Sequence, residues 1–146
     1  RVPNLNPAKV VGIIGFEPAG ANPAAPGFNN GPALMSSLKT EPALPANFAA
    51  VQKDGCAMQG DRPSKLVNYA NLPIVLVASE MGTLSQDAMK CGTAVWNQAG
   101  AKASSVYLPD RGLKGGGHFA MAQLDNADYA KVFIEIATEL ERASDK

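Results

Sequence analysis

The sequence predicts an α/β protein built on a parallel sheet. Segments of strand length alternate with segments of helical periodicity along the 146 residues of the chain, an order typical of parallel α/β sheets. The strongest of these segments, residues 73–79, is apolar on both faces. A strand of this kind is covered on each side, so we expect residues 73–79 in the centre of the sheet.

Two weaker segments complete the expected sheet. Residues 9–16 are rich in β-branched side chains and are interrupted by Gly12 and Gly15, and residues 104–108 form a third, shorter strand. A sheet of only these strands leaves an unpaired edge and has too few helices to cover both faces. We therefore expect another chain to supply the missing half, and we expect this chain alone not to fold stably.

Helical periodicity is clear in residues 86–99 and 127–142. The first helix follows Ser85, a suitable N-cap, and ends before Gly100, a residue type favoured directly after a helix. Asp125 or Asn126 is expected to cap the second. The expected apolar faces consist of Met89, Gly92, Val95, Trp96 and Ala99 in the first helix and of Tyr129, Phe133, Ile136 and Leu140 in the second.

Residues 18–70 form a long, proline-rich insertion between the first two strands. We expect short helices near residues 31–39 and 47–53 and irregular structure elsewhere. Long excursions of this kind usually carry function or cover a site. Their larger apolar side chains either line a substrate site beneath a cap or form the cap's own small core. These side chains are Phe28, Leu34, Met35, Leu38 and Phe48.

Composition excludes several classes of protein. The 13 Lys and Arg balance the 13 Asp and Glu, and the absence of a basic patch argues against nucleic-acid binding. No apolar run approaches the roughly 20 residues that span a bilayer. Cys56 and Cys91 either form one disulfide or pack as separate thiols, and their spacing is not that of a metal site. We therefore assign no metal and no cofactor. Low charge and frequent Ala, Gly, Pro and Asn favour a secreted protein.

His118 is the single histidine, and it follows three glycines after the third strand. A lone histidine is more often structural or solvated than catalytic. However, the Gly115–Gly117 run allows the backbone to bend sharply, and open α/β sheets place their sites beyond the carboxyl ends of their strands. His118 is therefore a candidate catalytic base.

Glu17 ends the first strand and precedes Pro18, which stops the strand and fixes the turn. It is either an exposed loop acid or a group that orients an imidazole, because a carboxylate near Nδ1 sets the tautomer and stabilises the imidazolium. Glu80 and Asp87 follow the second strand and compete for this role.

The segments GIIGFEPAG, LPIVLVASEMG and LPDRGLKGGGHFAM resemble the C-terminal half of α/β-hydrolase-fold esterases, above all a small branch of bacterial and fungal esterases with a glutamate acid after the sixth strand. The resemblance covers residues 9–20 and 72–142, and the insertion at 18–70 corresponds to a variable cap. It implies that this chain is the C-terminal part of an α/β-hydrolase fold, completed by another chain. It also implies that Glu17 is the triad acid and His118 the triad base, with Glu80 as the alternative acid.

The nucleophile's motif, Gly-x-Ser-x-Gly, does not occur in this sequence. The chain begins Arg-Val-Pro without an initiator methionine, so we expect a processed product or a fragment. In the resembled family the serine precedes the acid and the histidine, which places it before residue 1, with residues 1–8 as the connector at which a precursor is cut.

These expectations describe a proteolytically processed, two-chain enzyme, a serine-type hydrolase of carboxylic esters or lactones. The N-terminal chain of the same precursor would carry the serine, and this chain would supply Glu17 and His118. The alternative is a non-catalytic ligand-binding or assembly subunit with the same fold.

Overall fold

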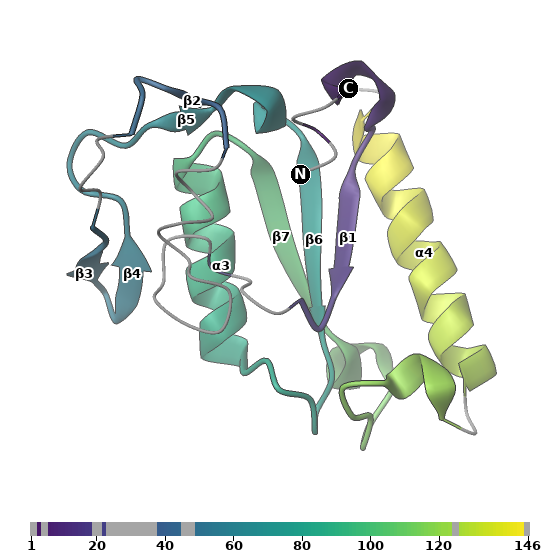
Figure 1. Ribbon diagram of the computed structural model, residues 1–146. Coiled ribbons are helices and arrows are strands. Elements are labelled where there is room, and N and C mark those ends of the chain that lie inside the picture. The colour runs from purple at the N-terminus through teal and green to yellow at the C-terminus, as the bar shows by residue number, and fades with distance from the viewer. Residues whose placement is uncertain are drawn as a thin grey trace.

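Three apolar segments form a parallel sheet in the order β1–β6–β7 (Figure 1). They are β1 (Ile13–Phe16), β6 (Pro73–Ala78) and β7 (Lys102–Tyr107). The computed structural model describes residue 3, residues 6–18, residue 22, and residues 38–44, 49–123 and 126–144. The three strands correspond to the three segments that the sequence predicts, with β6 in the centre as expected.

The side chains of β6 alternate between two apolar cores. Ile74 and Leu76 lie in one cluster together with Trp96 of α3 (Gln86–Gln98). Val75 and Val77 lie in the other, which contains four buried side chains of α4 (Asn126–Ser144). The two helices therefore cover opposite faces of the sheet, beside β7 and β1 in Figure 1. Within the described residues, each face of the sheet therefore has one helix.

Helix α3 has the predicted ends. The Ser85 hydroxyl accepts a hydrogen bond from the Ala88 N–H at 3.1 Å, and Gly100 has the left-handed φ of +97° that favours glycine after a helix. Met89, Gly92 and Val95 are buried as predicted. Local signals in the sequence were therefore sufficient to define this helix.

Helix α4 is rotated slightly from the predicted orientation. Tyr129, Ile136 and Leu140 are buried, but Phe133 is 44% exposed and Val132 is buried in its place. The face toward the sheet is centred on positions 129, 132, 136 and 140, which leaves Phe133 at its border. Asn126 is the first residue of the helix rather than its cap, and Asp125 lies outside the described residues.

Strand β1 is shorter than the predicted segment 9–16. Residues Pro7–Lys9 form the 3-10 helix η1, whose first turn accommodates a proline. Gly12 then passes close to α4, where a Cβ would overlap the Leu140 side chain. Strand β7 instead begins two residues before the predicted 104–108.

The insertion is more regular than expected. It contains two antiparallel pairs, β2 (Thr40–Glu41) with β5 (Lys65–Leu66) and β3 (Val51–Lys53) with β4 (Cys56–Met58). The prediction of a helix at 47–53 is wrong for the described residues 49–53. Asp54 and Gly55 both have positive φ, and this two-residue turn pairs β3 with β4.

Much of the predicted cap lies outside the described residues, including Phe28, Leu34, Met35, Phe48 and most of the expected helix at 31–39. Leu38 is buried in the same cluster as Ile74 and Leu76, so it belongs to the core on the α3 face of the sheet. Among the described residues, the remaining elements are the short helices η2 (Val67–Tyr69), η3 (Leu108–Arg111) and η4 (Ala120–Ala122).

Cys56 and Cys91 form a disulfide that joins β4 to α3, with a Cα–Cα distance of 5.1 Å. This resolves the two alternatives that the sequence left open. The bond attaches the β3–β4 hairpin to the helix on the same side of the sheet.

Replacing both cysteines with serine is expected to lower the free energy of unfolding by about 2–4 kcal/mol, because the bond closes a loop between residues 35 positions apart. Urea denaturation of the double variant and of the oxidised protein measures the difference. Under reducing conditions the two proteins should unfold at the same urea concentration. Equal stability under oxidising conditions would show that the bond does not stabilise the fold.

Candidate active site

The segments that leave the three parallel strands meet at one edge of the sheet, the lower edge in Figure 1. Glu17 follows β1, residues 79–84 follow β6, and His118 lies in the loop that follows β7 and η3. This is the edge at which open α/β sheets place their sites.

Glu17 occupies a strained and enclosed position. The residue is 3% exposed, and its φ of +43° lies in the left-handed region, which costs a non-glycine residue about 1–3 kcal/mol. Its N–H donates a hydrogen bond to the Val77 carbonyl at 2.8 Å. The turn thus continues the β1–β6 pairing by one residue and places the side chain beneath the segment that follows β6. Backbone strain of this kind is typical of functional sites.

The Glu17 carboxylate is surrounded by donors. Oε1 accepts from the Ser79 N–H at 2.6 Å and from the Ser79 hydroxyl at 2.8 Å. Oε2 accepts from the N–H groups of Thr83 at 3.0 Å and Leu84 at 3.1 Å. Burial raises the pKa of this carboxyl, but the hydrogen bonds from Ser79, Leu84 and Thr83 outweigh it and bring the pKa below its ordinary value. The group is therefore a carboxylate at neutral pH, held in one orientation.

Gly82 makes room for this carboxylate. A Cβ at Gly82 would overlap the carboxyl atoms of Glu17, and the hydrogen bonds around Glu17 leave it no other position. The turn at Gly82 is therefore tightly constrained.

Gly82→Ala is expected to reduce stability by about 1–3 kcal/mol, the usual cost of forcing a group into a packed site. Gly60→Ala is the matched control, because a Cβ there meets no atom within 4 Å and should change stability by less than about 0.5 kcal/mol. Thermal or urea unfolding of both variants makes the comparison. Equal stabilities would show that Glu17 does not occupy the described position.

The glycine run before His118 is attached to the segment after β6. The Glu80 carboxylate accepts a hydrogen bond from the Gly115 N–H at 2.7 Å, and the Met81 N–H donates to the Gly116 carbonyl at 2.8 Å. A Cβ at Gly116 would overlap the Tyr129 hydroxyl. Glu80 therefore holds the loop that carries the histidine and has no contact of its own with the imidazole among its described interactions.

The structure brings His118 and Glu17 together. The distance from His118 Nδ1 to Glu17 Oε2 is 3.7 Å, and the side chains are 37% and 0% exposed. We expected a direct hydrogen bond, and this distance is too long for one. The Thr83 hydroxyl lies 3.2 Å from Nδ1 instead, and the ring of Phe119 packs edge-on against the imidazole at 4.6 Å between centroids.

The two competing acids, Glu80 and Asp87, make other interactions. Glu80 binds the Gly115 N–H, and Asp87 lies exposed in the first turn of α3, where an acid offsets the positive end of the helix dipole. The sequence interpretation missed Ser79 and Thr83. The available signal was a run of small and polar residues directly after the central strand, at the edge where a site was expected.

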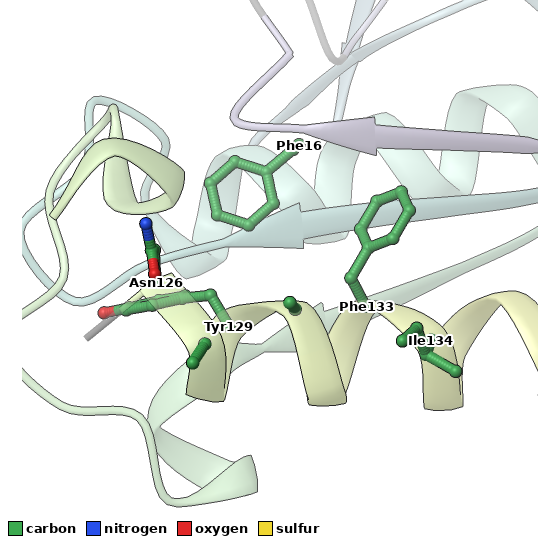
Figure 2. A pocket seen from close by; sticks show the side chains of 7 residues that line it. Phe16, Asn126, Tyr129, Phe133 and Ile134 are labelled. Atoms are coloured by element: carbon green, nitrogen blue, oxygen red, sulfur yellow. The ribbon is translucent and has the colours of Figure 1, made fainter. Parts of the chain in front are cut away.

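An apolar groove runs beside β1. A hollow of about 590 Å³ lies between the end of β1 and the first half of α4, and Figure 2 shows Phe16 on one side of it and Tyr129 and Phe133 on the other. A second hollow, of about 420 Å³, continues along the strand past Val11 and Gly12. Val11 is 66% exposed and Ile134 is 64% exposed.

Within the described residues, no three or more His, Cys, Asp and Glu side chains are grouped closely enough to hold a metal ion. No helix in this part of the chain is long and apolar enough to cross a bilayer. Comparisons of the chain with protein-family models, with curated proteins and with solved structures found no match.

Proposed function

We propose that this chain is the C-terminal part of an α/β-hydrolase-type esterase and supplies the acid and the base of a serine hydrolase that acts on carboxylic esters or lactones. The observation that supports this best is the pairing of the single imidazole with a buried, ionised carboxylate, 3.7 Å apart, at the carboxyl edge of a parallel sheet. The motifs around Glu17 and His118 resemble those of such esterases.

In the proposed reaction, His118 Nε2 takes the proton of a serine hydroxyl as the serine oxygen attacks the ester carbonyl. The imidazolium then gives this proton to the leaving alcohol, and water repeats the sequence to release the acid. Glu17 carries a negative charge at the site and stabilises the imidazolium formed in each step. Phe119 is 70% exposed and packs against the imidazole, and Met81 is 73% exposed and forms a β-bridge with Gly117, the residue before His118. These apolar side chains favour an uncharged substrate with apolar groups.

The nucleophile must come from outside this sequence, which has no Gly-x-Ser-x-Gly motif. Ser79, the serine closest to Glu17 in the site, is 2% exposed, and its hydroxyl faces the Glu17 carboxylate. A buried hydroxyl in this position cannot reach a substrate. We propose that a second polypeptide, the N-terminal chain of the same precursor, carries the serine.

The exposed side of β1 suits this partner. Among the described strands, β1 pairs only with β6, and the groove beside it is apolar. A parallel strand added at β1 would end at the same edge of the sheet as Glu17 and His118. In the resembled family, the strand that corresponds to β1 neighbours the strand of the nucleophile.

The disulfide supports a location in an oxidising compartment, because disulfides form and persist in such compartments. We propose that the protein is secreted or otherwise extracytoplasmic.

Purification of the chain under native conditions tests the proposal. A second chain that contains a Gly-x-Ser-x-Gly turn should co-purify at a fixed one-to-one ratio, and the complex should hydrolyse short p-nitrophenyl esters. A stable monomer of residues 1–146 that unfolds cooperatively and has no partner would contradict it. A fixed complex that hydrolyses no ester would instead support the non-catalytic alternative.

A further inference from the structure

The Glu17 carboxylate has little capacity left for the imidazole. Three backbone N–H groups and the hydroxyls of Ser79 and Thr83 lie within hydrogen-bonding distance of its two oxygens. A carboxylate offers about four acceptor positions. A direct hydrogen bond from His118 would therefore have to displace one of these donors, three of which belong to the fixed backbone.

Thr83 lies between the two groups. Its hydroxyl oxygen is 3.4 Å from Glu17 Oε2 and 3.2 Å from His118 Nδ1. The position of the residue is fixed independently of the hydroxyl, because the Thr83 and Leu84 N–H groups both donate to Oε2. The hydroxyl is therefore not needed to hold the turn and is available to contact the imidazole.

The direction of the hydrogen bonds follows from the charge on Glu17. An ionised carboxylate can only accept, so in the hydrogen bond between Thr83 Oγ1 and Glu17 Oε2 the hydroxyl donates its single proton. The hydroxyl then presents a lone pair to Nδ1, and Nδ1 must carry a proton to use it. The negative charge 3.7 Å away favours a proton at the same position.

We propose that Thr83 is a positioning residue that links Glu17 to His118 and holds the imidazole as its Nδ1–H tautomer. Nε2 is then left without a proton and is able to accept one. The tautomer is a property of this chain's own residues, and only its consequence for ester hydrolysis rests on the proposed function.

Two substitutions separate the hydroxyl from the rest of the side chain. Thr83→Val keeps the shape of the side chain and removes the hydroxyl, while Thr83→Ser keeps the hydroxyl. Both variants retain the backbone N–H groups that hold Glu17. A difference between them therefore reports on the hydroxyl and not on the turn.

Imidazole 15N chemical shifts distinguish the tautomers. His118 is the single histidine of the chain. When only this chain is labelled with 15N and is purified together with any partner chain, its imidazole gives one unambiguous pair of signals. The wild type and Thr83→Ser should show the Nδ1–H form. Thr83→Val should show a smaller fraction of it, because only the charge of Glu17 then favours that form. An Nε2–H imidazole in the wild type, or identical signals in all three proteins, would overturn the proposal.

Kinetics give a second readout. Thr83→Val should lower kcat for a p-nitrophenyl ester by about ten- to a hundredfold, the effect of one hydrogen bond to a charged group, with KM little changed and with rescue by Thr83→Ser. Equal kcat in Thr83→Val and the wild type would contradict a role in catalysis. If neither the wild type nor any variant hydrolyses an ester, the proposed function fails. The 15N signals alone then decide the role of Thr83.

Discussion

Replacing His118 with alanine is expected to abolish ester hydrolysis by the two-chain protein. A general base contributes a factor of about 10² to 10⁴, and the loss is larger when the base acts in a triad with a nucleophile and an acid. Structural damage should be small, because the side chain is 37% exposed and its described contacts are the Thr83 hydroxyl, the Phe119 ring and, at 3.7 Å, the Glu17 carboxylate. Initial rates on a p-nitrophenyl ester measure the effect.

Two observations make this result interpretable. The unfolding midpoint of His118→Ala should stay close to that of the wild type, and the partner chain should still co-purify. If both hold and turnover stays near normal, His118 is not the base and the proposed function fails with it.

Glu17→Gln is expected to lose both stability and turnover. The surroundings of Glu17 do not accommodate an amide. Oε1 faces the Ser79 N–H, and Oε2 faces the Thr83 and Leu84 N–H groups. An amide NH₂ in either position sets a donor against a donor, which costs about 1–3 kcal/mol.

The pKa of Glu17 makes the loss of stability depend on pH. Because the pKa of this carboxyl is lowered in the folded protein, its contribution is complete above the ordinary glutamate pKa of about 4.3. The contribution is lost as the pH falls through the lowered, folded-state value. Urea unfolding at pH 7 and near pH 3 should therefore show a difference between wild type and Glu17→Gln that shrinks in acid. A difference that is the same at both values would show that Glu17 is not preferentially ionised in the folded state.

Glu80→Gln is the matched control. Glu80 is exposed, and its carboxylate accepts a hydrogen bond from the Gly115 N–H. The amide oxygen of a glutamine can accept the same hydrogen bond. We expect a change in stability below about 0.5 kcal/mol and nearly normal turnover. Loss of turnover in Glu80→Gln with retention in Glu17→Gln would exchange the roles of the two acids.

Local and topological rules predicted much of this structure. The apolar character of residues 73–79 on both faces identified the central strand, and Ser85 and Gly100 identified the ends of α3. The proximity of Glu17 and His118 follows from a parallel sheet, because the carboxyl ends of all its strands lie at one edge.

Other features depend on contacts that the sequence does not display. Helical periodicity allows an error of one position, so Phe133 was expected inside and Val132 is buried in its place. The turn at Asp54-Gly55 pairs β3 with β4 and outweighs helical propensity at residues 51–53. Thr83 acquires its place only when the loop after β6 folds back over the carboxylate of Glu17, 66 residues earlier in the chain.

Labelling with a fluorophosphonate ester tests the central claim most directly, because this reagent forms a bond from phosphorus to an activated serine oxygen and releases fluoride. Intact mass measurement of the native protein then identifies the labelled chain. We expect the label on a Gly-x-Ser-x-Gly serine of a co-purifying chain, at a rate that falls at least about 10²-fold in His118→Ala. An unlabelled protein, or equal labelling of wild type and His118→Ala, would contradict the assignment of His118 as the base that serves a serine on a partner chain.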